Sequence, residues 1–425
     1  MKKTLISLLA SSAAVFSAAL AQTTAIMDAR VHTIAGDVIE NGDIIIRDGR
    51  IAEIGADLTA PAGATVIDAT GKIVTPGLFV PYSQIGLVEI GSQKETNDSR
   101  PAEGFPLSAA LNTIDAFNPS SVVIPVNRAE GVTRALSAPS AGDKLFGGRA
   151  AVVDLSGRAN SITKAEAAQV AVMGYGGAAR AGDTRMGAWA VLREYLDEAR
   201  SYHANPNEYT RRPRNERFAL SDLKALGAVI DGQQPLIVQV NSANDIRSVI
   251  RLKNTYRLNI VILGGTEAWR VADELVSANI PVIISGLANL PRQFEDIDST
   301  LKNAARLHRA GVKLAFVSDT HKAHLIRQHA GNAVAEGLPM AAALRAITLT
   351  PAEIYGVDSQ LGSLEVGKIA DVVIWDGDPL EVTTQPEAVF IAGQQQDLNN
   401  RQKMLVERYR DLTRGDLPFA YRGGE

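Results

Sequence analysis

The sequence contains no cysteine among its 425 residues. Disulfide bonds, thiolate metal sites, cysteine nucleophiles and lipid anchors attached to cysteine are therefore all excluded. It contains only six histidines, so a metal site built from imidazoles has few candidate ligands. The formal net charge is −4 at pH 7. This mild acidic balance argues against nucleic acid or an anionic membrane as the main partner.

Long apolar runs are also scarce, and the longest occupies residues 5–20, directly after Lys2 and Lys3. A basic start, a short apolar run and Ala-Leu-Ala at residues 19–21 form the pattern of a secretory signal peptide. The run is shorter than the ~20 apolar residues that a spanning helix needs. We therefore predict a signal peptide over residues 1–21 and export to the periplasm or the cell exterior, without membrane attachment after cleavage. An uncleaved anchor is the alternative.

Two β-rich segments lie at opposite ends of the chain. Between residues 24 and 73 apolar residues recur mainly with a period of two, and Asp48-Gly49 is a hairpin signal between two short runs. Near the other end, GSLEVGKIADVVIWDGDP over residues 362–379 contains the apolar run 370–375 between glycine-rich turns. These patterns predict β structure at both ends.

Between these segments the pattern changes to alternating strands and helices. Four apolar runs have the composition of buried parallel strands: residues 236–240, 259–263, 281–284 and 313–317. A long helix is predicted over residues 185–202, a polar connection over 203–218 and an amphipathic helix over 399–412. Repeated strand–helix units form either an open doubly wound sheet or a closed barrel, and periodicity alone does not choose between them.

The turn Pro76-Gly77 in IVTPGLFVPYSQIGLVEI, residues 73–90, decides that choice together with the segment 362–379. In both segments the chain resembles the amidohydrolase superfamily, metal-dependent hydrolases that include imidazolonepropionase, dihydroorotase and prolidase-like enzymes. The resemblance extends over residues 41–392. It implies an α/β fold, a (β/α)8 TIM-like barrel with a small β-sandwich domain built from both termini.

The resemblance also implies boundaries for the parts of the chain. They are a signal peptide at 1–21, a composite β-sandwich domain at 22–75 and 361–398, the barrel at 76–360, and a C-terminal helix and tail at 399–425.

Members of this superfamily carry metal ligands at the ends of barrel strands. They take a His-x-His pair from strand 1, lysine or glutamate from strand 4, histidines from strands 5 and 6, and aspartate from strand 8. The matching positions here are Tyr82, Gln84, Gln239, Gly264 and Asp319, and no lysine or glutamate ends the candidate fourth strand at 170–173. Only Asp319, the catalytic residue that the resemblance implies, keeps its type. Because useful metal affinity needs about three protein ligands, we predict no metal at this set.

A second candidate ligand set follows strand 8. Asp319, His321 and His324 lie within six residues, and the two imidazoles share a helix face if a helix starts near Thr320. This trio is the one place where zinc is expected, if the cluster binds it. The alternative is that Asp319 caps the helix and the histidines are ordinary surface residues.

Two functions remain open. The first is an exported hydrolase of non-peptide carbon–nitrogen bonds, as the resemblance implies. The second is a pseudoenzyme, either a barrel that binds a small-molecule ligand or a structural partner of an active paralogue, with homo-oligomers permitted. In the second case the substrate-binding positions would be Tyr82, Gln84, Gln239, Gly264, His321 and His324. Five of the six ligand positions have lost their residue type, so hydrolysis by a two-metal site is disfavoured and the second function is favoured. Function follows from the site rather than from the fold.

Overall fold

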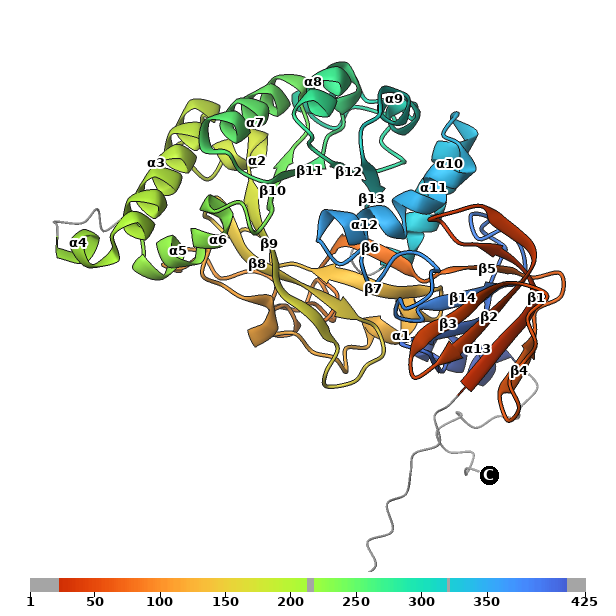
Figure 1. Cartoon of the computed structure of the whole chain (residues 1–425). Helices are drawn as coiled ribbons and strands as arrows, with labels where there is room; N and C mark the ends of the chain where they lie inside the picture. The colour runs from red at the N-terminus through yellow and green to blue at the C-terminus, as the bar shows by residue number, and fades with distance from the viewer. Residues whose placement is uncertain (1–22, 212–217, 319–321, 411–425) are drawn as a thin grey trace, which may run out of the picture.

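The structure, a computed structural model, describes residues 23–211, 218–318 and 322–410 (Figure 1). The predicted signal peptide lies outside these ranges. Within them, none of the helices combines the length and the apolar character that a membrane crossing requires. Figure 1 shows two sheets, a small one at the right of the view and a large curved one surrounded by helices.

The small sheet combines strands from both ends of the chain. Its order is β16-β15-β14-β5-β1-β2-β3, and β4 pairs with β1. The strands are β1 (Thr23–His32), β2 (Val38–Arg47), β3 (Arg50–Ala56), β4 (Thr65–Asp68), β5 (Ile73–Pro76), β14 (Val372–Trp375), β15 (Pro386–Ile391) and β16 (Gln394–Gln395). The hairpin predicted at Asp48-Gly49 is confirmed, since it joins β2 to β3 and both residues have positive φ.

The large sheet is the predicted barrel. Its eight strands follow the order β13-β12-β11-β10-β9-β8-β7-β6, and β13 also contacts β6, so the sheet nearly closes. The strands are β6 (Leu78–Ser83), β7 (Val132–Ser137), β8 (Phe146–Asp154), β9 (Ile162–Val172), β10 (Leu236–Val240), β11 (Ile260–Gly264), β12 (Val282–Ile284) and β13 (Leu314–Phe316). One strand departs from the all-parallel pattern, because β8 is antiparallel to both β7 and β9.

Helices follow most of the barrel strands, and most of them lie outside the sheet (Figure 1), whereas the helix at residues 349–354 contributes Ala352 and Ile354 to the interior cluster of the barrel. They are α1 (Val123–Arg128), α2 (Gly174–Ala178), α3 (Arg185–Ala204), α4 (Pro206–Arg211), α5 (Leu220–Ala225), α6 (Gly227–Ile230), α7 (Ala243–Tyr256), α8 (Ala272–Ser277), α9 (Asn303–Ala310), α10 (Ile326–Ala335), α11 (Met340–Ala346), α12 (Leu349–Ile354) and α13 (Arg401–Arg410). The Ser242 hydroxyl caps α7 by accepting from the backbone N–H of Asp245.

Alternate residues of each barrel strand face opposite sides, as a pleated strand requires. In β10, Leu236, Val238 and Val240 pack in the cluster that includes the helices, whereas Ile237 belongs to a separate interior cluster. That interior cluster takes side chains from all eight strands and also includes Tyr355, just after α12. The middle of the barrel is therefore a packed core.

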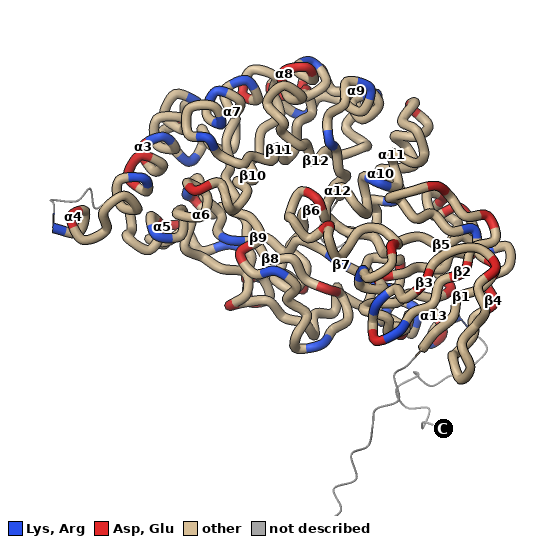
Figure 2. Tube along the Cα trace, in the orientation of Figure 1, with Lys and Arg blue, Asp and Glu red and all other residues tan. Residues whose placement is uncertain are grey.

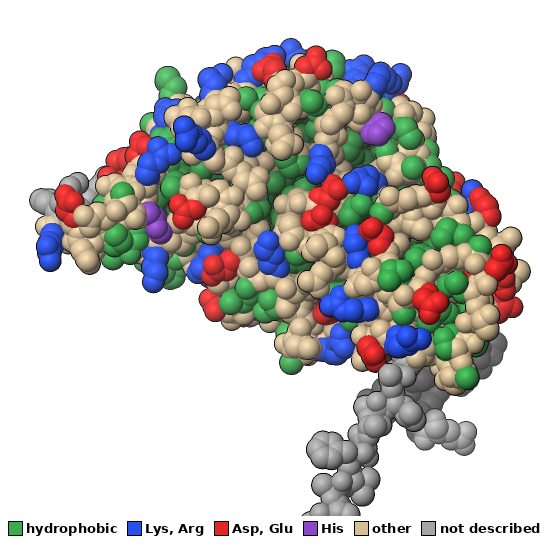
Figure 3. All heavy atoms as spheres, in the orientation of Figure 1, with side chains coloured by type: hydrophobic (Ala, Val, Ile, Leu, Met, Phe, Trp, Pro, Cys, Tyr) green, Lys and Arg blue, Asp and Glu red, His purple; other side chains and the backbone are tan. Residues whose placement is uncertain are grey.

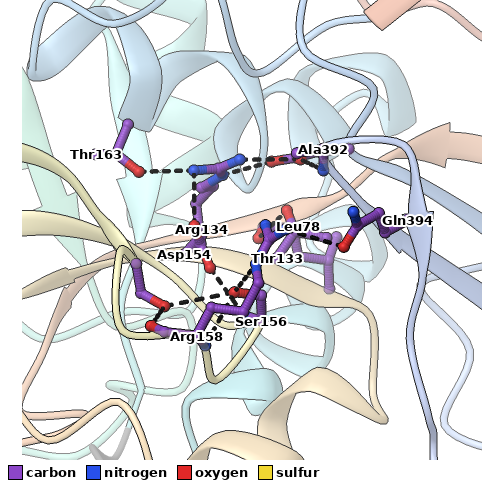
Figure 4. Close-up of polar contacts among 11 residues, drawn as sticks. Leu78, Thr133, Arg134, Asp154, Ser156, Arg158, Thr163, Ala392 and Gln394 are labelled. Atoms are coloured by element: carbon purple, nitrogen blue, oxygen red, sulfur yellow. Dashed lines mark hydrogen bonds and ion pairs between the residues drawn. The ribbon is translucent and has the colours of Figure 1, made fainter. Parts of the chain in front are cut away.

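A buried arginine joins the barrel to the small β domain (Figure 4). Arg134 of β7 donates from Nε to Asp371 Oδ2 (2.5 Å) and from Nη2 to Asp371 Oδ1 (3.1 Å). Its Nη1 donates to Thr163 Oγ1 (2.6 Å) and lies 3.7 Å from Asp154 Oδ2. Burial alone lowers the pKa of Arg134, but Asp371 and Asp154 outweigh it and raise that pKa. Arg134 is therefore protonated, and its hydrogen bonds hold the guanidinium in one position.

Candidate functional site

The candidate site is the barrel mouth, where the carboxyl ends of the parallel strands meet. The strand register defines one inward-facing layer there: Gln239 pairs with Val172 and Leu263, Leu263 with Ile283, and Ile283 with Ala315. Leu263, Ile283 and Ala315 belong to the interior cluster, which places the layer inside the barrel. Gln239 is its one polar side chain, and it is exposed to solvent. This layer is neutral and mostly apolar.

The first strand adds a phenol to the mouth. Tyr82 is half-buried and packs against the interior cluster, and burial raises its pKa to about 12. It therefore stays protonated at neutral pH and offers a hydroxyl rather than an anion. The nearby Tyr355 hydroxyl donates to the carbonyl of Pro81 (2.5 Å). Gln84 lies just beyond the strand, where its carbonyl accepts from the backbone N–H groups of Leu87 and Val88.

Gly264 does not face the barrel interior. Its register partners Val240 and Ile284 pack in the helix-facing cluster, so the inward position near the end of β11 is Leu263. Gly264 has φ +102°, and a Cβ built there would lie 2.5 Å from Asn241 Oδ1. The position therefore requires glycine for close approach of the neighbouring loop.

Of the second ligand set, only His324 lies within the described residues; Asp319 and His321 lie outside them. His324 is directed at α1: its backbone N–H and ring Nδ1 both donate to Asn127 Oδ1, at 2.9 Å and 3.0 Å. Burial, with Arg327 and Lys322 nearby, lowers its pKa to about 4. With Nδ1 as the donor, Nε2 is the ring nitrogen of His324 that remains available as an acceptor or a ligand.

A charged cluster that no sequence pattern predicted lies over the ends of β9 and β10. Glu295, from the segment after β12, accepts from Tyr175 N–H (2.8 Å), Asn241 Nδ2 (3.2 Å) and Arg185 Nη2 (3.4 Å). Arg185 Nε also donates to Asp245 Oδ2 (3.1 Å). These residues come from four separate segments, so no local motif signals the cluster. Since each carboxylate already has donors, the cluster anchors the segment after β12 beside the mouth.

Comparison with known proteins agrees with the fold. Residues 244–401 match the Amidohydrolase family. The structure superposes on an amidohydrolase from Thermotoga maritima with a TM-score of 0.79 and 26% identity, over 88% of this chain and 99% of that one. The chain belongs to the amidohydrolase superfamily.

Two curated relatives of this superfamily member cover most of it. An imidazolonepropionase from Sphingopyxis alaskensis is 25% identical over 84% of this chain and 92% of its own length. The amidohydrolase tasK of Hapsidospora irregularis is 23% identical over 83% of this chain. The chain spans only 39% of the length of tasK.

The described mouth of this superfamily member does not fit a catalytic divalent ion. Such an ion needs imidazole or carboxylate ligands at the strand ends, and a neutral amide or phenol is a weak substitute. In residues 23–211, 218–318 and 322–410, no three histidine, aspartate or glutamate side chains are grouped so that they could hold a metal. The polar groups that Gln239 and Tyr82 bring to this mouth are an amide and a phenol hydroxyl, both neutral at pH 7.

Proposed function

We propose that this chain is an exported, catalytically silent member of the amidohydrolase superfamily that binds a small ligand at the barrel mouth. The observation that carries the proposal is the mouth layer Val172–Gln239–Leu263–Ile283–Ala315, in which Gln239 is the one polar side chain. Metal-assisted hydrolysis requires an ion that lowers the pKa of its bound water. Apolar side chains and an amide do not hold that ion.

The same layer indicates the class of ligand. A glutamine amide offers two N–H donors and one carbonyl acceptor, which complement another amide or a ureide. Its register neighbours Val172 and Leu263 are apolar, so a ligand that hydrogen-bonds to the exposed amide of Gln239 can also contact apolar surface beside it. A small molecule with an amide or ureide group and an apolar part fits this combination.

Hydrolysis of non-peptide carbon–nitrogen bonds is the second candidate. The names of the relatives support it, since an imidazolonepropionase shares 25% identity with nearly the whole chain. It would depend on Asp319 and His321, since the described strand ends supply no comparable ligands. If the chain is catalytically silent and binds no small ligand, the remaining possibility is that it is a structural partner of an active paralogue.

A ligand screen separates these functions. Untagged protein from residue 22 onward is melted with N-acyl amino acids, dipeptides and ureides, and each compound is also assayed for hydrolysis. Saturating ligand stabilises by about 2.7 kcal/mol at one hundred times Kd, which raises Tm by a few degrees. We expect at least one such shift, lost in Gln239→Ala and kept in Gln395→Ala, an exposed glutamine of β16.

The outcomes differ for each candidate. Stabilisation without turnover supports the silent ligand-binding barrel. Turnover that disappears in Asp319→Asn supports the hydrolase and contradicts the silent function. Absence of any shift contradicts the small-ligand role and leaves the structural partnership.

A further inference from the structure

A groove separates α3 from α7 on the outer side of the barrel. Its volume is about 510 Å³. The α3 wall presents Arg185, Met186, Trp189 and Arg193, which recur at helical spacing along one face. The α7 wall presents Asn244, Asp245, Ser248, Arg251, Leu252, Thr255 and Tyr256. The groove therefore combines cations with an aromatic and apolar floor.

The groove is basic although the whole chain is acidic. Three arginines line it against one carboxylate, Asp245, and that carboxylate already pairs with Arg185. Among the described residues, Arg193 and Arg251 form no ion pair, and Arg251 donates only to the Ser248 hydroxyl (2.7 Å). Figure 2 shows blue segments on both α3 and α7, and Figure 3 shows basic side chains gathered over this part of the surface.

We propose that this groove binds an extended acidic peptide segment of another protein. Charge complementarity favours an acidic ligand, because Arg193 on the α3 wall and Arg251 on the α7 wall both line the groove and form no ion pair within the described residues. The exposed Met186 and half-buried Trp189 provide a surface for an apolar side chain between two acidic residues.

Arg185 is already paired with Asp245 and Glu295, so the cations that remain for a ligand are Arg193 and Arg251. The fitting segment therefore has two acidic residues, with an apolar residue between them that contacts Met186 and Trp189.

The probe is the peptide acetyl-Glu-Ala-Leu-Ala-Glu-amide, titrated into the full protein by calorimetry and by tryptophan fluorescence. Of the three tryptophans, Trp189 lines the groove, while Trp375 is fully buried and Trp269 lies under Arg306. We expect saturable binding with a Kd between about 10 μM and 1 mM. The fluorescence change disappears in Trp189→Phe.

The variants Arg193→Glu and Arg251→Glu test the charges, and both residues are exposed, so neither change disturbs the core. Each is expected to weaken binding about tenfold, and salt should weaken it in the wild type. Arg47→Glu, an equal charge change on exposed β2, leaves affinity unchanged.

Three results would overturn the inference. They are equal binding of the peptide with glutamine in place of both glutamates, unchanged affinity in both groove variants, and absence of binding by the glutamate peptide. If glutarate binds as tightly as the peptide, the ligand class is a small dicarboxylate rather than a peptide, and the proposal is contradicted.

Discussion

Arg134 of β7 and Asp371, which directly precedes β14, form a two-point ion pair between the barrel and the small β domain (Figure 4). Both side chains are about 95% inaccessible to solvent. Asp371 Oδ1 also accepts from the backbone N–H of Ala392, so one carboxylate joins the barrel to the two C-terminal strands around it. Each domain therefore contributes one buried charge. If its partner were removed, that charge would have no water to solvate it.

Removing one member of this pair should destabilise the whole protein. Arg134→Met leaves the buried carboxylate of Asp371 without its cation, which costs about 3–5 kcal/mol, and Asp371→Asn, which leaves Arg134 only the more distant Asp154, should cost less. Urea unfolding measures the change. The matched control is Arg30→Met, whose partner Glu40 is exposed, and a loss below about 1 kcal/mol is expected there. Equal losses in the two pairs would show that the buried pair is not a link between the domains.

His329 should make stability depend on pH. Its Nδ1 accepts from the backbone N–H of Gly286 (3.1 Å), so protonation breaks that bond, and burial lowers its pKa to about 4. The unfolded chain therefore binds the proton more readily, and the free energy of unfolding falls as pH decreases from 6.5 towards 4.

The expected loss is about 2 kcal/mol between pH 6.5 and pH 5, and unfolding in urea at the two values measures it. His329→Asn keeps an acceptor for Gly286 but does not titrate, so it should remove about half of the total pH dependence, since His324, whose pKa is also lowered to about 4, contributes a similar share. His308→Asn, on the exposed face of α9, should not change it. A wild-type slope that persists in His329→Asn would assign the effect to other groups.

Glu295 should hold the segment after β12 in place. Glu295→Ala removes the acceptor for Tyr175 N–H, Asn241 and Arg185, and hydrogen bonds to a charged group contribute about 1.5–3 kcal/mol each. Amide exchange in residues 286–301 and at Tyr175 is expected to rise at least about tenfold. In Glu53→Ala, an exposed change in β3, exchange in that segment stays the same. An unchanged rate in Glu295→Ala would mean that other contacts fix the segment.

Strand positions were predictable where the sequence pattern is local. The run 236–240 is β10 in the structure, since five apolar-rich residues lie between Pro235 and Asn241. The predicted long helix is confirmed as α3. The direction of β8 was not predictable, because an apolar run has no polarity and only its pairing with β7 and β9 shows that it is reversed.

Other elements differ from their predictions for identifiable reasons. β9 begins at Ile162 rather than Val170, because Lys164 and Glu166 hide the start of an otherwise apolar strand. The amphipathic helix predicted over residues 399–412 forms as α13, but its Leu405 and Tyr409 are exposed, so these apolar residues cover no core in the described chain. The end of the predicted range, residues 411 and 412, lies outside the described residues.

The candidate site was predictable only in part. The resemblance placed Tyr82 and Gln239 at strand ends, and both lie at the barrel mouth. It could not show that Gly264 faces away, since this depends on the register of β11 with its neighbours. Nor could it reveal Glu295 beside Arg185, because 110 residues separate them.

The proposal that this chain holds no catalytic metal is tested by the metal content of untagged protein from residue 22 onward, purified without added metal and measured by mass spectrometry. We expect less than about 0.1 zinc, manganese or iron per chain, and the same Tm with and without chelator. About one or two ions per chain, lost when Asp319 or His321 is replaced, would contradict it.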